Sequence, residues 1–177
     1  MIGHNRGPSM EGGQAWRRHC WTKARKSLLK TLPIEILRVR VARAAEIGLD
    51  YKSYASIRAA SGHDVIAFLF SSNALRVLPK TEVMPEDRVL KLAALKNIDR
   101  FAACHAPLES VPEMQSFTAP NARHTWGETR AIILGEVHKR HLPRDGVVVV
   151  GDTSHERAWS EAARLAGYVS AERFFTP

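Results

Sequence analysis

Residues 146–156 read Gly-Val-Val-Val-Val-Gly-Asp-Thr-Ser-His-Glu, and this stretch decides the fold class. The four consecutive valines are β-branched and too few for a helix, so residues 147–150 predict a strand. Thr153 and Glu156 have the spacing of a capping box, in which a hydroxyl and a carboxylate satisfy backbone N–H groups at the start of a helix. A strand that leads directly into a helix indicates an α/β domain.

One strand cannot form a sheet alone, so residues 147–150 need a partner elsewhere in the chain. The two candidates are residues 65–70 and 168–175. The first is a short apolar run that suits a buried strand or a buried helix, and periodicity does not separate the two. Because residues 71–77 continue it without a turn residue, a helix beginning at Asp64 is favoured. We therefore expect a predominantly helical α/β fold with a small, two- to three-stranded sheet flanked by helices.

Helical spacing and cap residues predict most of the remaining chain to be helical. From Trp16 to Leu28 an apolar residue recurs every four positions, which places one apolar stripe on a helix over residues 14–31. Thr125 and Glu128 form a second capping-box pattern. Together with proline and glycine at expected helix ends, these patterns predict further helices over residues 33–48, 51–61, 85–103, 125–141 and 153–167.

The length of 177 residues suits one domain. Residues 1–13 are expected to be a flexible N-terminal arm, and residues 14–177 a single globular domain with a basic helical half over 14–80 and a loop over 107–123. No apolar run reaches roughly 18 residues and the N-terminus lacks the apolar part of a secretory signal, so we expect no integral membrane association and a cytoplasmic location. The two cysteines are too few for a disulfide framework and are expected to be reduced.

Positive charge is concentrated in the first half of the chain. Residues 1–80 hold 14 Lys and Arg against 5 Asp and Glu, whereas residues 81–177 hold 12 against 13, which together give the net charge of +8. Basic side chains on consecutive helices attract polyanions through counterion release, and nucleic acid is the commonest such partner. An acidic protein partner and an anionic membrane surface are alternatives that fit the same charge.

The predicted interaction is with phosphate groups, and little sequence discrimination is expected because the adjoining residues 65–70 are too apolar to contact base edges. The two tryptophans of the first predicted helix are expected to stack on bases or to insert into an interface. The predicted polyanion-binding residues are Arg17, Arg18, Arg25, Lys26, Arg38, Arg43, Trp16 and Trp21.

Residues 146–156 also resemble the acidic motif of the haloacid dehalogenase superfamily, in which a strand ends in Gly-Asp and a second carboxylate follows four residues later. The resemblance implies that Asp152 and Glu156 hold Mg²⁺, and that residues 70–73 are similar to the family's strand ending in a phosphate-binding Ser or Thr. The family's nucleophile requires Asp-x-Asp, which the sequence lacks, so no phosphoaspartate forms.

Asp152 and Glu156 therefore have two possible roles. A divergent Mg²⁺-dependent phosphohydrolase would use them as metal ligands, and this is the alternative to a polyanion-binding protein. In the other interpretation Gly, Asp and Thr serve only the turn and the helix cap. The sequence contains no serine nucleophile elbow, P-loop or dinucleotide-binding glycine pattern, so no catalytic residue and no other cofactor are assigned.

Overall fold

The structure is a computed structural model that describes residue 23 and residues 32–77, 84–105 and 114–176. The chain divides into two compact units, residues 1–38 and 39–177. Helix α2 (Ile34–Glu46) begins in the first unit and ends in the second. The predicted N-terminal arm, and all but Lys23 of the helix predicted over residues 14–31, lie outside the described residues.

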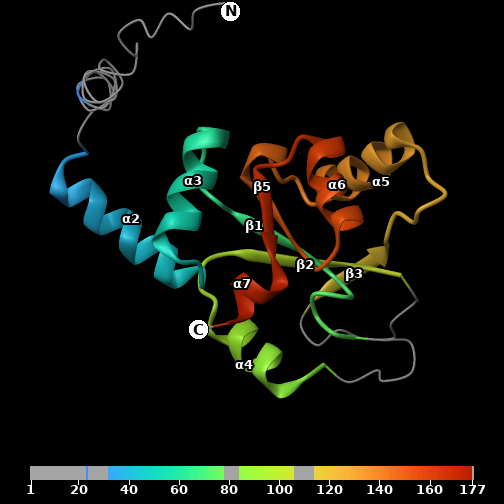
Figure 1. The fold of residues 1–177 in the computed structure, drawn as a ribbon, viewed down its shortest axis with the longest axis horizontal. Helices are drawn as coiled ribbons and strands as arrows, with labels where there is room; N and C mark the ends of the chain where they lie inside the picture. Colours follow the sequence, from blue (N-terminus) through green and yellow to red (C-terminus); the bar gives the residue numbers. More distant parts are fainter. Residues whose placement is uncertain (1–22, 24–31, 78–83, 106–113, 177) are drawn as a thin grey trace, which may run out of the picture. The chain divides into compact units, whose positions relative to one another are not determined.

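The second unit contains a sheet of five strands in the order β3-β2-β1-β4-β5 (Figure 1). All four strand pairings are parallel. The expectation of a small, two- to three-stranded sheet is therefore wrong, although the fold is α/β. The strands are β1 (Ala67–Ser71), β2 (Asp99–Cys104), β3 (Gln115–Thr118), β4 (Val147–Gly151) and β5 (Gly167–Ser170).

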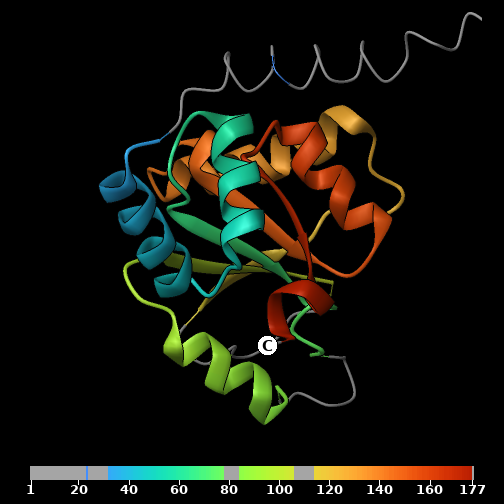
Figure 2. The ribbon, with the colours of Figure 1, turned by 60° about the vertical axis from the view of Figure 1, so that its left-hand side comes forward.

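Helices cover both faces of the sheet, so the unit has three layers (Figures 1 and 2). Successive residues of a strand point to opposite faces. Accordingly, Phe68 and Phe70 belong to one hydrophobic cluster with residues of α3, α4 and α7, while Leu69 packs in a second cluster with Ile133 of α5 and Trp159 of α6. These helices are α3 (Tyr51–Ser61), α4 (Glu86–Ala94), α5 (Trp126–Lys139), α6 (Ser154–Ala163) and α7 (Ala171–Phe175).

The strand predicted over residues 147–150 is confirmed as β4, and both candidate partners pair with it. Residues 67–70 lie on one side of β4 and residues 167–170 on the other. The helix favoured from Asp64 is wrong, because all five residues of β1 are buried in the middle of the sheet. A fully apolar run suits a strand that is covered on both faces.

The two strands that the sequence patterns missed explain the underestimated sheet. The helix predicted over residues 85–103 ends at Ala94, and Asn97 then adopts a left-handed φ of 53° that directs the chain into β2. Strand β3 lies inside the predicted loop over residues 107–123. Its four residues are mostly exposed at the edge of the sheet and carry no alternating apolar pattern.

The predicted helix starts and the glycine stops after α2 and α3 are correct because they rest on local chemistry. Both capping boxes are formed, one at the start of α5 and one at the start of α6. Gly48 and Gly62 adopt positive φ after α2 and α3, as glycine allows. Helix α6 ends at Ala163, before the predicted stop at Gly167, because Arg164 takes the left-handed cap position itself.

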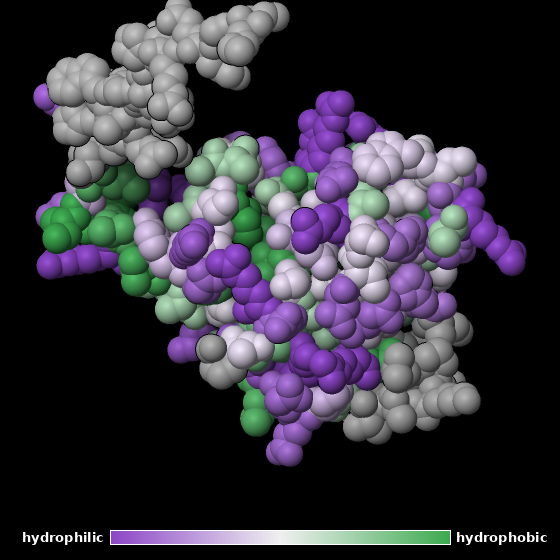
Figure 3. All heavy atoms as spheres, viewed as in Figure 1, coloured by the Kyte–Doolittle hydropathy of each residue, from purple (hydrophilic) through white to green (hydrophobic). Residues whose placement is uncertain are grey.

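Helix α2 presents apolar side chains to solvent over much of its length. Five of them are exposed, and hydrophobic colour gathers over this helix in Figure 3. They are Ile34, Ile36, Leu37, Val39 and Val41. None of the helices in the described ranges combines the length and the apolar character that a membrane crossing requires.

Candidate functional site

The carboxyl ends of β1 and β4 meet at the point where the sheet changes its direction of winding. From β1 the chain continues to β2 on one side, and from β4 it continues to β5 on the other. Ligands of open α/β sheets bind at such a switch point. Residues 71–73 follow β1 and residues 151–153 follow β4, so the predicted acidic pair, Asp152 and Glu156, lies at this switch point.

The Glu156 carboxylate is fully buried and is hydrogen-bonded by the protein itself. Its Oε2 accepts hydrogen bonds from the backbone N–H groups of Asp152 and Thr153, the latter at 2.9 Å. Its Oε1 accepts a hydrogen bond of 2.8 Å from Nδ2 of Asn73. The carboxylate thus joins the turn after β4 to the turn after β1.

This geometry does not fit a magnesium site. Mg²⁺ keeps several water molecules and binds carboxylate oxygens that project into solvent or toward a phosphate. Asp152 is exposed, but both oxygens of Glu156 are occupied inside the protein. Across residues 32–77, 84–105 and 114–176, no three His, Cys, Asp or Glu side chains are grouped so that they could hold a metal ion.

The serine at the end of β1 also has a structural role. The Ser71 side chain is buried, and its Oγ accepts a hydrogen bond of 3.0 Å from the backbone N–H of Ala74. The hydroxyl therefore closes the turn after the strand.

Of the eight predicted polyanion-binding residues, the structure describes only Arg38 and Arg43. Arg38 is exposed on α2. Arg43 instead bonds within the protein, from Nε to Asp64 at 3.1 Å and from Nη1 to Glu46 at 3.3 Å, and its Nη2 donates to the backbone carbonyls of two further residues. The six that lie outside the described residues are Trp16, Arg17, Arg18, Trp21, Arg25 and Lys26.

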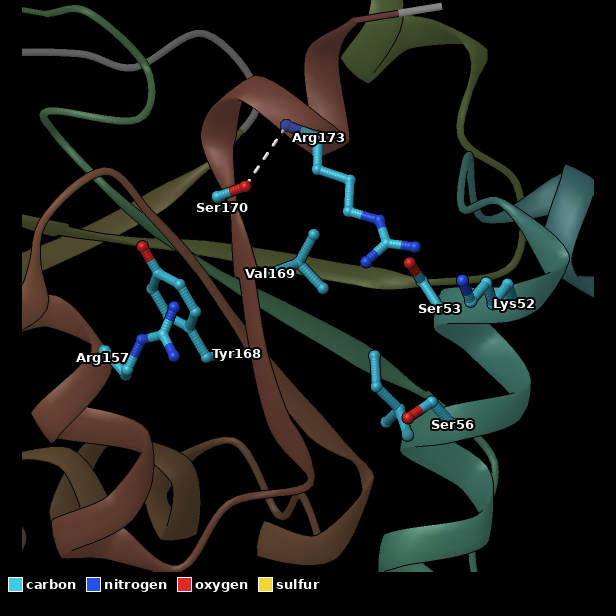
Figure 4. A pocket seen from close by; sticks show the side chains of 9 residues that line it. Lys52, Ser53, Ser56, Arg157, Tyr168, Val169, Ser170 and Arg173 are labelled. Atoms are coloured by element: carbon cyan, nitrogen blue, oxygen red, sulfur yellow. Dashed lines mark hydrogen bonds between the residues drawn. The ribbon is translucent and has the colours of Figure 1, made fainter. Parts of the chain in front are cut away.

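A different group of cations lines a pocket beside strand β5 (Figure 4). The pocket has a volume of about 270 Å³ and lies between the first turn of α3, β5, the first turn of α6 and α7. Its lining contains three basic side chains and no acidic one. The lining residues are Lys52, Ser53, Ser56, Ile57, Arg157, Tyr168, Val169, Ser170 and Arg173.

One of the three cations is neutralised by a neighbour. Arg173 forms an ion pair with Asp50 through Nε at 3.2 Å and Nη2 at 3.4 Å. Burial opposes ionisation of Asp50, but hydrogen bonds from Ser53 and Arg173 outweigh it and hold the pKa of the carboxyl below its ordinary value. Lys52 and Arg157 form no ion pair with any residue in the described ranges. Two of the three cations that line the pocket therefore have no ion-pair partner among the described residues.

Arg157 is held in place by an aromatic ring. Its guanidinium carbon lies 4.8 Å from the centroid of the Tyr168 ring, in a cation–π arrangement. The Tyr168 hydroxyl donates a hydrogen bond of 2.9 Å to the carbonyl of Gly151, which fixes the ring against the end of β4. Burial raises the pKa of Tyr168, and the charge of Glu156 raises it further, so this hydroxyl stays protonated at neutral pH.

Charge counting missed this pocket because two of its cations come from the half of the chain that is nearly neutral. Arg157 and Arg173 are separated from Lys52 by more than a hundred positions in sequence, and only the packing of α3 beside β5 brings the three together. The chain matches no model of a known protein family, and no significant similarity to a curated protein or to a solved structure was found.

Proposed function

We propose that this protein binds nucleic acid as a polyanion, through phosphate groups and with little sequence discrimination. The pocket beside β5 carries the proposal, because Lys52 and Arg157 supply two positive charges that no described carboxylate neutralises. Exposed cations that line one pocket without an ion-pair partner attract an anionic ligand. The net charge of +8 supports the same ligand class, since it raises the local concentration of polyanions around the whole chain.

The hydroxyl groups of the pocket suit phosphate oxygens. Serine hydroxyls donate hydrogen bonds to phosphates in many nucleic-acid complexes and read no base sequence. Ser56 is exposed in the pocket, and no described group hydrogen-bonds its side chain. The basic residues predicted within residues 14–31, together with exposed Arg38, belong to the same proposal as further phosphate contacts.

The proposal includes a cytoplasmic location. Nucleic acid is available there, and thiols remain reduced in that compartment. Cys104 is a free, buried cysteine, and its burial raises the pKa of the thiol to about 11, so the thiol is unreactive in the folded protein. An acidic protein is the competing partner, and competition by polyglutamate for the bound nucleic acid distinguishes the two.

The test is fluorescence anisotropy of labelled DNA and RNA of mixed sequence, titrated with the full chain between about 50 and 200 mM salt. We expect affinity to fall steeply as salt rises. Combined replacement of Lys52→Ala and Arg157→Ala should weaken binding and reduce the salt slope by about two, because each lost phosphate contact removes about one unit. No measurable binding at about 50 mM salt would contradict the proposal.

Arg123 provides a matched control. It is an exposed arginine in the turn before α5, outside the pocket, and Arg144 is a second exposed arginine outside it, so the double variant Arg123→Ala with Arg144→Ala removes two charges from other surfaces, as many as the pocket variant removes. The pocket variant should lose clearly more affinity than this control. Equal losses would show that only the net charge matters.

A further inference from the structure

The basic pocket lies across the open edge of a strand. In the described sheet β5 pairs only with β4, so its other edge has no strand neighbour. Figure 4 shows Arg157 and Tyr168 on one side of β5, and Lys52, Ser53 and Ser56 of α3 on the other. The cations therefore border a trough that crosses the edge of the strand, which suits an extended ligand better than a compact anion.

The size of the trough favours a single strand over a double helix. A volume of about 270 Å³ is at the lower end of the range for small-molecule sites, which begins at roughly 300 Å³. A duplex presents its phosphates on the outside of a stiff rod with grooves roughly 6 and 12 Å wide, and it cannot enter such a space. A single strand is narrow and flexible enough to follow the trough.

The side chains on the two sides of β5 differ in what they offer to a single strand. Arg157 presents a planar guanidinium that Tyr168 supports from behind, and such a plane stacks on an unpaired base. Lys52 offers an ammonium group, and Arg173 keeps Nη1 without a hydrogen-bond partner among the described residues. These groups suit the sugar-phosphate backbone.

From this arrangement we infer that the trough binds a single strand of DNA or RNA across the edge of β5. A base stacks on the guanidinium plane of Arg157, and the neighbouring phosphates contact the charges of Arg157, Lys52 and Arg173. The inference rests on the proposed function and adds to it that the nucleic acid is single-stranded and that it crosses the edge of β5.

The first experiment compares a labelled single-stranded oligonucleotide with the duplex of the same sequence at the same salt concentration. The full chain should bind the single strand about tenfold more tightly, the size expected from one stacked base. Equal or tighter binding of the duplex, with a steep salt dependence, overturns the inference and leaves the proposed function standing. If neither form binds, both fail.

The second experiment separates stacking from charge with Arg157→Lys, which keeps the positive charge and removes the guanidinium plane. This variant should retain the salt slope of the wild type and lose about tenfold in affinity for the single strand. Its affinity for an abasic strand of the same length should equal that of the wild type. An unchanged affinity for the normal single strand overturns the inference.

Two controls accompany this comparison: the stability of the variant and competition by an acidic polymer. Arg157 is exposed and its side chain forms no hydrogen bond with a described residue, so the thermal unfolding midpoint of Arg157→Lys should match that of the wild type. Polyglutamate of similar charge serves as the competitor that represents an acidic peptide. Displacement of the single strand by polyglutamate at equal charge concentration would assign the trough to an acidic peptide and overturn the inference.

Discussion

The two capping boxes of this protein have the same sequence pattern and very different surroundings. In the box of α5, Glu128 is exposed, and within the described part of the chain its carboxylate accepts hydrogen bonds only from Thr125. In the box of α6, Glu156 is fully buried and bonds three partners from two separate turns. The same four-residue motif thus caps α5 locally, whereas at the start of α6 it also links the turn after β4 to the turn after β1.

The difference arises from what precedes each helix. Helix α6 begins directly after β4, so its first turn lies beside the residues that follow β1. Helix α5 follows an exposed turn over residues 121–124, and its cap is surrounded by solvent. A local motif predicts that a helix begins, and the tertiary neighbours decide how much stability depends on it.

The largest expected effect is that of Glu156→Ala. The substitution leaves the backbone N–H groups of Asp152 and Thr153 and the amide of Asn73 without their acceptor in a buried place. Each orphaned donor is costly, so we expect a loss of about 3 kcal/mol or more in the free energy of unfolding. The measurement is urea unfolding of both variants, and Glu128→Ala should shift the midpoint far less. Similar shifts would mean that burial does not distinguish the two boxes.

Asn73→Ala should give the next largest effect. It removes the charge-assisted hydrogen bond of 2.8 Å to Glu156, for which we expect a loss of about 2 kcal/mol. Asn121→Ala is the matched control, because its Oδ1 accepts one hydrogen bond at an exposed turn before the other box. A double-mutant cycle with Glu156→Gln should show coupling for Asn73 and none for Asn121. Additive effects of Asn73 and Glu156 would contradict the proposed link between the two turns.

What could be predicted from the sequence follows the same division between local and distant interactions. Residues 147–150, both capping boxes and the glycine stops at Gly48 and Gly62 rest on neighbouring residues, and all of them are confirmed. Strands β2 and β3 could not be predicted, since parallel strands pair with residues far away in sequence. An exposed edge strand such as β3 also lacks the apolar alternation by which strands are recognised.

The partners of the cationic residues also could not be predicted, because they lie far away in the sequence. Counting charges selected Arg43, but its partner Asp64 lies 21 positions away and only the fold reveals the pair. The pKa of Asp64 is held below its ordinary value because hydrogen bonds from Tyr54 and Arg43 outweigh the effect of its burial. Conversely, Arg157 and Arg173 lie in a nearly neutral half, and nothing in composition distinguishes them from solvated surface charges.

Replacing the threonine of either box should reduce the stability by a similar amount, unlike replacing the two glutamates. Thr125 and Thr153 each accept one hydrogen bond from the backbone N–H three residues later. Loss of an N-cap hydroxyl costs about 1 kcal/mol, so Thr125→Ala and Thr153→Ala should destabilise by similar amounts in urea unfolding. A much larger loss for Thr153→Ala would show that its hydroxyl, as well as Glu156, supports the sheet.

The smallest effect concerns the pH dependence of the exposed box. Hydrogen bonds from the backbone and the hydroxyl of Thr125 lower the pKa of Glu128 from its ordinary 4.5. A lowered pKa in the folded state means that the contribution of this carboxylate is complete above pH 4.5 and is lost as pH falls through the folded-state pKa. Glu128→Gln does not titrate, so the difference in unfolding midpoint between wild type and variant should shrink as the pH is lowered from about 6 to about 3. Because Glu128 is in solvent, this difference should also shrink as salt is added. A difference that stays constant with pH would mean that the ionised carboxylate contributes nothing beyond its amide counterpart.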